Sequence, residues 1–558
     1  MRRFMGFRAS IAALAAVTST TLLAQAGPAS PEPLDHAMEP PAAATAPVSE
    51  AAADHHNHAD AVAPKVATLL PGYGDGGFAV TTGVPAAQAF FSNGLELGAA
   101  FAHKAAVGAM TEAVRLDPAC AMCLWGEALV TAPTINFGAD KKQRAELLPL
   151  ARKAKALAAR TGTARERALT AALVRRFQPG DPIKRDIAYA DAMAAVARDY
   201  PADNEIAVLA ADAIMVASFA QDDEPDLARL RTAIPLLETV LARAPEHTPA
   251  IHFYIHATEI LGEPAKAEPY ADKLATLAPR ASHLVHMPAH TFYWVGRYQE
   301  TAETNRRAVE IGKDNAARLG LDGPDGVFGL PYHAHNIIYG LGGALMAGDS
   351  AVALDLARPL VARAGTQDEA EPVIQLLTAS GYFAIARFDP ASVSALPEPR
   401  LPYLKAAWHY ARGEAAAWSG DREALAAEIA AIPDKIAADP AALEVRAAET
   451  MLGVTRNVLA GRAALLAGDH AAAVAAFTRG AELEETPAFG EFTDPPAFWY
   501  PVRRDVAAAL LAAGDASGAK AAAEASLKLR VKDPVAEALL ARAQAQLGSA
   551  PTVALRTD

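Results

Sequence analysis

The sequence predicts an all-α protein, built as an α-solenoid of stacked antiparallel helix pairs. Between about residues 85 and 547, Ala, Leu, Glu and Arg dominate, and alternating β-branched runs are scarce. Glycine-led turns of one kind recur between short helical segments, as in "VGRYQETA", "AGDSAVAL" and "AGDHAAAV". Residues of the same type also recur 34 positions apart. A fixed spacing of this size indicates a repeated helix pair.

The N-terminal residues 1–26 predict a secretory signal peptide. Three arginines, at positions 2, 3 and 8, precede a short apolar run and a small-x-small cleavage pattern that ends at Ala26. We therefore expect cleavage after Ala26 and export to a bacterial periplasm. No other stretch is apolar for long enough to predict a transmembrane segment.

The charge and cysteine content exclude two classes of function. Removal of the three N-terminal arginines takes the formal charge from −13 to −16. An acidic chain is poorly suited to nucleic acid or anionic lipid, since both require neutralised phosphates. Two cysteines exclude a disulfide scaffold, and 52% apolar residues provide material for a large core.

The composition also predicts the domain organisation. Residues 27–65 are rich in Ala, Pro and His without apolar periodicity, so we expect a disordered linker. Its histidines are suited to loose capture of copper or zinc, or only to keeping the linker solvated. We expect a loop-rich lead-in at 66–84, the solenoid at 85–547 and a disordered tail at 548–558.

The 34-residue spacing links glycines and histidines in neighbouring repeats. It separates Gly262 from Gly296, and the same spacing separates His252 from His286 and His256 from His290. Residues 87–118 also place small residues where two helices must approach closely. The pattern resembles the tetratricopeptide repeat (TPR), which implies a helical solenoid with a concave groove.

Three stretches support a narrower resemblance. "HFYIHATE", "HLVHMPAH" and "EFTDPPAFWYPVR" are similar to segments of exported bacterial TPR-repeat proteins that carry an HxxHMPAH-type motif. This resemblance implies a fold and an exported location, and it supplies no mechanism.

Histidines concentrate on the predicted inner helix faces. In a repeat register with the turn glycine at the fifteenth place, the second, fifth, ninth and twelfth places face inward, because steps of three and four stay on one helix face. Seven metal-capable side chains from three neighbouring helices fall at such places: His252, His256, Glu259, His283, His286, His290 and His335.

This constellation predicts a metal site in the groove. A His-x-x-x-His pair places two imidazoles one helical turn apart, and neighbouring helices lie about 8–10 Å apart, so two helices can share an ion. Histidine and carboxylate ligands suit zinc, copper(II) or iron(II). Pro288 should kink its helix and re-aim the histidines around it. A later helix start, leaving His283 in a loop, is the alternative.

Three functions remain open from the sequence. The first is a metal-dependent protein that binds or transforms a small ligand in the groove. The second is a metal-free TPR scaffold that binds a peptide or a partner protein, with the histidines forming a polar network or binding an anion. The third is a periplasmic metal buffer or chaperone. The sequence identifies no substrate, nucleophile or general base, so it does not distinguish an enzyme from a binding protein.

Five further residues are candidate functional positions. Cys120 and Cys123 lie in what we expect to be the first turn of a helix starting at Asp117-Pro118, and they predict a local disulfide or, alternatively, a redox pair. Trp125, Asn136 and Arg504 are candidate ligand contacts in the groove. Their alternatives are core packing for Trp125, a turn for Asn136 and a packed loop cap around Arg504.

Overall fold

The computed structural model describes residues 67–136, 141–219, 225–321, 323, 326–438, 442–490, 492 and 494–549. The predicted signal peptide, the linker at 27–65 and most of the predicted C-terminal tail lie outside these residues. Residues 67–84 contain no helix. The first described helix begins at Pro85, and the last ends at Ser549.

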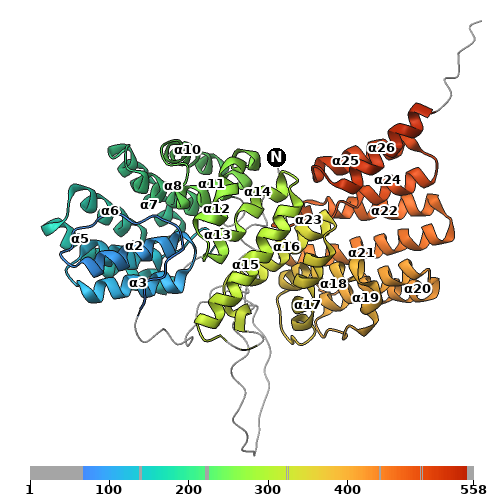
Figure 1. Ribbon diagram of the computed structural model, residues 1–558, viewed down its shortest axis with the longest axis horizontal. Coiled ribbons are helices and arrows are strands. Elements are labelled where there is room, and N and C mark those ends of the chain that lie inside the picture. The colour runs from blue at the N-terminus through green and yellow to red at the C-terminus, as the bar shows by residue number, and fades with distance from the viewer. Residues whose placement is uncertain are drawn as a thin grey trace, which may run out of the picture.

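The first half of the chain forms helices that pack in sequence along one end and the middle of the molecule (Figure 1). They are α2 (Pro85–Ala99), α3 (His103–Leu116), α4 (Ala121–Val130), α5 (Lys141–Thr161), α6 (Ala164–Arg176), α7 (Pro182–Asp199), α8 (Asn204–Phe219), α9 (Leu227–Arg231), α10 (Ile234–Arg243), α11 (Thr248–Ile260), α12 (Glu268–Leu277), α13 (Ser282–His286) and α14 (Pro288–Trp294), with a short 3-10 helix at Pro264–Lys266.

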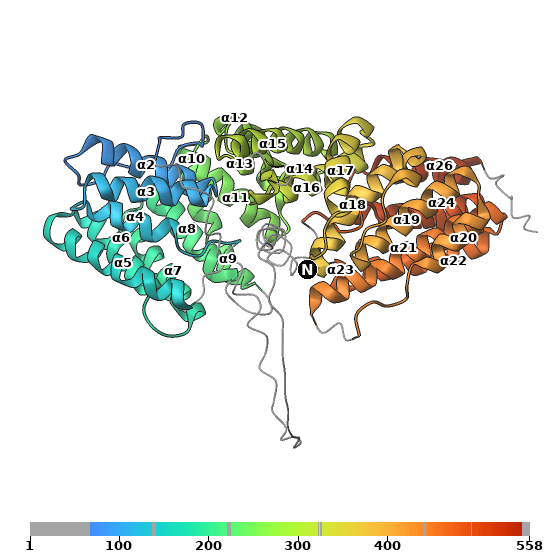
Figure 2. The same cartoon turned by 90° about the horizontal axis from the view of Figure 1, so that it is seen from below.

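The second half continues the stack toward the opposite end (Figure 2). Its helices are α15 (Tyr298–Arg318), α16 (His333–Ala347), α17 (Ser350–Ala364), α18 (Pro372–Phe388), α19 (Pro402–Ser419), α20 (Arg422–Ala431), α21 (Leu443–Ala467), α22 (His470–Glu484), α23 (Pro487–Gly490), α24 (Arg503–Ala512), α25 (Ala516–Leu529) and α26 (Pro534–Ser549), with 3-10 helices at Gly326–Gly329 and Pro390–Ala395. The predicted all-α, TPR-like solenoid of stacked antiparallel helix pairs is confirmed.

The recurring Gly-Asp turns explain how each pair is formed. Gly348 has a φ of +79°, a left-handed conformation that glycine adopts without a steric penalty, and it ends α16. The next residue, Asp349, accepts a hydrogen bond from the backbone N–H of Val352 at 3.0 Å and so caps α17. One dipeptide therefore stops a helix and starts the next. Six glycines at turns between helices have a positive φ: Gly262, Gly296, Gly348, Gly420, Gly468 and Gly514.

The buried apolar residues form two clusters that meet in the middle of the solenoid. One extends from Tyr73 to Phe292 and includes Tyr332. The other extends from Ala289 to Ala543. The boundary between them falls at α13 and α14, the helices that carry "HLVHMPAH". The histidines therefore lie where the two halves of the core join.

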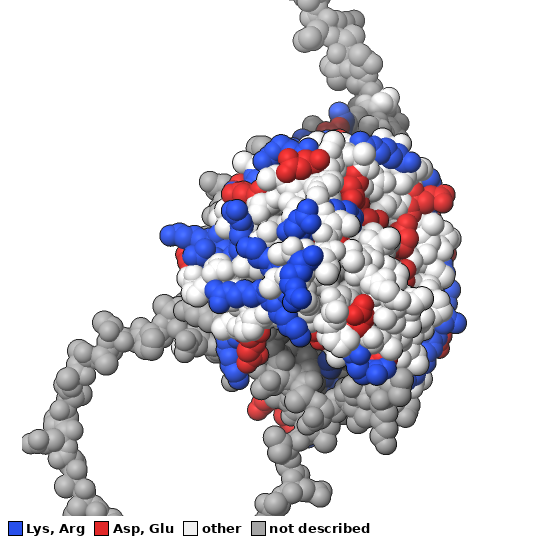
Figure 3. Space-filling view, turned by 90° about the vertical axis from the view of Figure 1, so that its left-hand side faces the viewer, with Lys and Arg blue, Asp and Glu red and all other residues white. Residues whose placement is uncertain are grey.

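The basic run at residues 141–155 forms one side of α5. Exposed Lys142, Arg152, Lys153 and Lys155 alternate with apolar residues that face the core. Figure 3, which looks onto the end of the molecule, shows lysine and arginine side chains gathered on part of that surface. Among the described residues, no helix has the length and apolarity needed to cross a bilayer.

Candidate metal centre

The seven predicted ligand residues come together, but in the protein interior. His252, His256 and Glu259 are on α11, His283 on α13, His286 and His290 flank the α13–α14 break, and His335 is on α16. Each of these side chains is between 0% and 5% exposed. The expectation that they line an open groove is therefore wrong. Segments outside these four helices cover them, and a repeat register does not reveal such segments.

Two residues with unusual backbone conformations form part of this cover. Phe101 follows α2, and its ring stacks on His283 with a centroid separation of 4.9 Å. The ring of Tyr332, before α16, lies 4.3 Å from that of His283. Both have a positive φ, 56° and 69°, which is unfavourable for residues with a Cβ. The backbone is thus strained where it seals the histidines, a pattern common at functional sites.

The six histidines divide into two triads. In the α11 triad, defined as His252, His256 and His283, the Nε2 atom of His252 lies 3.1 Å from Nε2 of each partner. In the α16 triad, defined as His286, His290 and His335, the Nε2 atom of His286 lies 2.8 Å from that of His290 and 3.1 Å from that of His335. Each triad therefore turns three ring nitrogens toward one point.

In three of the histidines, a hydrogen bond holds the opposite ring nitrogen, Nδ1. Nδ1 of His252 donates to the carbonyl oxygen of Ala99 at 2.7 Å. Nδ1 of His286 lies 2.6 Å from Oδ1 of Asn305, whose own amide donates to the carbonyl of Thr301. Because that amide orientation makes Oδ1 an acceptor, the proton of His286 must be on Nδ1.

His290 is fixed in the same way by a carboxylate. Its Nδ1 lies 2.7 Å from Oε2 of Glu259, while Trp294 and Tyr339 donate to the other oxygen of Glu259. Nδ1 of neutral His290 therefore carries the proton. The Nε2 atoms of His286 and His290 then present lone pairs to each other at 2.8 Å. Such a contact is repulsive unless a proton or a metal cation lies between the two atoms.

The spacing of the Nε2 atoms suits a metal ion. Zinc–nitrogen bonds of about 2.0–2.1 Å in a tetrahedral site place ligand nitrogens about 3.3 Å apart. A shared proton can remove the repulsion between one pair of nitrogens, whereas a metal ion can accept a lone pair from all three nitrogens of a triad. Hydrogen bonds from Nδ1 to a carboxylate or carbonyl are also the usual way that proteins orient metal-binding histidines.

Asp494 is a member of this site that the sequence did not assign to it. Its carboxylate is 2% exposed, with Oδ1 3.4 Å from Nδ1 of His290 and 3.9 Å from Nε2 of His335. Among the described residues, neither oxygen accepts a hydrogen bond. A buried carboxylate without a donor is costly unless it binds a cation or a proton. The sequence signal that could have identified Asp494 was its position in "DPPAFWYP", a segment that interrupts the helical pattern.

Burial controls the charge of the cluster. It lowers the pKa of His252 to about 3, and it holds the pKa values of His256, His283, His286 and His335 well below their usual range. Burial also acts to lower the pKa of His290, but Glu259 and Asp494 outweigh it and raise that pKa. Burial raises the pKa of Asp494. Most of the imidazoles are thus neutral, the form that binds metals.

The kink predicted at Pro288 is confirmed. The helix breaks at Met287 into α13 and α14, because proline provides no N–H for the carbonyl of Leu284. His283 lies within α13, so the alternative that placed it in a loop is wrong. The break lets His283 join the α11 triad, while His286 and His290 belong to the other triad.

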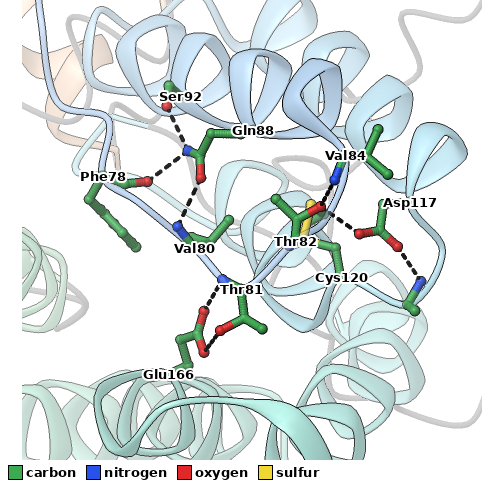
Figure 4. Close-up of a disulfide and its surroundings, with 12 residues drawn as sticks. Phe78, Val80, Thr81, Thr82, Val84, Gln88, Ser92, Asp117, Cys120 and Glu166 are labelled. Carbon is green, nitrogen blue, oxygen red and sulfur yellow. Dashed lines mark hydrogen bonds between the residues drawn. A yellow bond between two sulfur atoms is a disulfide. The ribbon is translucent and has the colours of Figure 1, made fainter.

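The predicted disulfide joins Cys120 to Cys123. Its helix, α4, begins at Ala121 and not at Asp117-Pro118 as expected, with Cys120 as the N-cap that accepts from the N–H of Cys123. Asp117 instead accepts a hydrogen bond from the hydroxyl of Thr82 in the lead-in segment (Figure 4). This tie holds the Asp117-Pro118 turn outside the helix.

The structure does not support the three predicted groove contacts. Trp125 is fully buried and packs near Phe78, so it is a core residue. Arg504 is 5% exposed, lies over the ring of Tyr500 and pairs with Asp533 at 3.4 Å, so its guanidinium is already engaged inside the fold. Asn136 is buried and donates to the hydroxyl of Tyr332 at 3.1 Å. It therefore supports the cover of the α11 triad.

The comparisons with known proteins add little beyond the fold. No protein-family model matches the chain, and no curated protein matches it. Among solved structures, it is similar to the APC/C hetero-tetramer Cut9-Hcn1, with 12% identity, a TM-score of 0.30 and coverage of 82% of this chain and 76% of that chain. It is also similar to yeast Tom70, with 11% identity, a TM-score of 0.25 and coverage of 83% and 89%.

A third similar structure is the TPR domain of P58(IPK), with 13% identity, a TM-score of 0.22 and coverage of 84% of this chain and 99% of that chain. At these TM-scores, the matches carry no argument about function. The assignment of the fold rests on the helix pairs and turn glycines described above.

Proposed function

We propose that this protein is an exported metalloprotein whose histidine cluster binds a transition metal as a resident centre. One observation carries the proposal: the Nε2 atoms of His286 and His290 face each other at 2.8 Å while hydrogen bonds to Asn305 and Glu259 hold the opposite nitrogens. The buried carboxylate of Asp494 adds negative charge beside them. Imidazole ligands favour zinc, copper or iron(II).

The burial of the site bears on the alternative of a metal buffer. A buffer or chaperone must exchange its ion rapidly with solution, which requires accessible ligands. The ligands here are at most 5% exposed, and Phe101 and Tyr332 cover the α11 triad. Slow exchange is therefore expected, and a resident centre that acts on a small ligand agrees better with this geometry.

Elemental analysis of untagged protein, purified from the periplasm of the host, tests the proposal. We expect near-stoichiometric zinc, copper or iron in the wild type and little metal in a His256→Ala/His290→Ala variant of unchanged helical content. His470→Ala is the matched control, because His470 lies at the start of α22, far along the chain from the cluster. It should retain the metal.

A wild-type protein that contains no metal and takes up none on titration would overturn the proposal. The histidines would then form a hydrogen-bonded core, and the remaining function would be a TPR-like scaffold for a peptide or protein partner. Export is tested separately, by locating the chain in cell fractions and determining the N-terminal residue of the mature protein.

A further inference from the structure

We infer that the centre holds two metal ions, one in each histidine triad. This inference rests on the proposed function and goes further, because it specifies the number of ions and the ligands of each. The starting observation is the number of donors. Six imidazoles are more than one tetrahedral ion can bind.

The distances separate the donors into two sets. Within the triads, the Nε2 atoms lie 2.8–3.1 Å from those of His252 or His286. The ligand atoms of His252, His256 and His283 lie within 4.8 Å of one another, and so do those of His286, His290 and His335. Among the described residues, no such group combines members of the two triads. One ion at a bonding distance of about 2 Å cannot reach both sets of nitrogens.

A third group of donors is formed by Glu259, His290 and Asp494. It is a poor separate site, because Nδ1 of His290 carries the proton that it donates to Glu259. The two carboxylates instead serve the α16 triad. Glu259 orients His290, and Asp494 lies 3.9 Å from Nε2 of His335, close enough to approach an ion bound there. The α16 triad is thus the one that has negatively charged carboxylates beside it.

The arrangement also limits what the ions can bind. Three imidazoles leave a fourth position open on each ion, the coordination that catalytic metal sites retain. Two adjacent ions with open positions can share one ligand. Because every member of the two triads is at most 5% exposed, the ligand class that fits without rearrangement is small and inorganic, of the size of water or hydroxide.

Metal titration of the metal-free full chain tests the inference, with Zn²⁺ as the probe and a chromophoric chelator as competitor. We expect two equivalents to bind to the wild type. His256→Gln/His283→Gln should bind one equivalent through the α16 triad, and His335→Gln should bind one tightly through the α11 triad. The His470→Ala control should bind two.

If the wild type binds one equivalent and either variant binds none, the two-ion inference is wrong and the metalloprotein proposal stands. A stoichiometry of zero would overturn both. A second measurement does not depend on the folding of variants. When the wild type is loaded with Cu²⁺, ions in neighbouring triads should couple magnetically, so that the electron paramagnetic resonance signal falls well below that expected for the copper bound. A full, uncoupled signal would contradict the inference.

Discussion

Nδ1 of His290 and Oε2 of Glu259 are joined by a 2.7 Å hydrogen bond, although the two residues lie 31 positions apart on α14 and α11. This bond assigns the tautomer of His290 and turns its Nε2 toward His286. Because Glu259 also accepts hydrogen bonds from Trp294 and Tyr339, the carboxylate is held from several sides.

Glu259→Gln should weaken metal binding about 10–100-fold, the usual effect of losing a carboxylate that orients a metal-binding histidine. Glutamine carries no charge, and its amide group cannot accept all three hydrogen bonds. A competition titration with a chelator measures the effect. Glu428→Gln is the matched control, since Glu428 makes the same kind of bond to His409 at 2.7 Å outside the cluster. Equal affinities in the two variants would contradict the assigned role.

Gly340→Ala should destabilise the protein by about 1–3 kcal/mol, because the added methyl group overpacks the core. Its Cβ would lie 2.6 Å from a methyl carbon of Leu356 and 2.8 Å from Cβ of Asn305, the residue that holds His286. Metal affinity should therefore fall as well. Urea unfolding and the chelator titration measure the two effects.

Gly108→Ala is the corresponding control for the glycine substitution. Gly108 lies within α3, and an added Cβ would meet no atom within 4 Å. Alanine should then stabilise the helix by up to about 1 kcal/mol, because it favours helix more than glycine does. A loss of stability similar to that of Gly340→Ala would show that the packing argument is wrong.

Glu484→Gln should stabilise the protein at alkaline pH. Burial raises the pKa of Glu484 to about 7, from an ordinary value of 4.5, despite a hydrogen bond from the N–H of Val502. The folded protein thus binds this proton more tightly than the unfolded chain. The group costs no stability below about pH 4.5 and an increasing amount as the pH rises through 7.

The expected difference between Glu484→Gln and the wild type is therefore largest at pH 8, at up to about 3 kcal/mol for a shift of this size. It should be smallest at pH 4.5. Urea denaturation of both proteins at the two pH values measures it. A difference that does not change with pH would show that the carboxyl group is not the source of the effect.

Cys120→Ser/Cys123→Ser should lower the free energy of unfolding by at most about 2 kcal/mol, because the disulfide closes a very short loop and short loops constrain the unfolded chain little. The metal content should not change, since α4 supplies no member of either triad. Loss of metal in a variant that remains helical would instead indicate that α4 positions the centre.

The sequence by itself determined the repeated helix pair and the alignment of the histidines. Helix periodicity, the left-handed turn at glycine and the cap by the following aspartate are local effects, acting over a few residues. The 34-residue spacing gives His252 and His286 the same place in consecutive repeats. It thereby places the seven donors on the facing sides of neighbouring helices. Local rules were therefore sufficient to predict the repeated helix pair, the kink at Pro288 and the candidate metal ligands.

Only the tertiary structure decided whether these donors were exposed and how they were divided. Phe101 and Tyr332 cover the α11 triad, and Asp494 reaches the cluster from beyond α23. The partner of His252 is Ala99, 153 residues away. Trp125 and Arg504 were misassigned to the groove for the same reason, because a place in a repeat does not reveal which distant segment packs on it. Burial, tautomer and the separation into two triads depend on contacts between residues far apart in the chain, which no local pattern encodes.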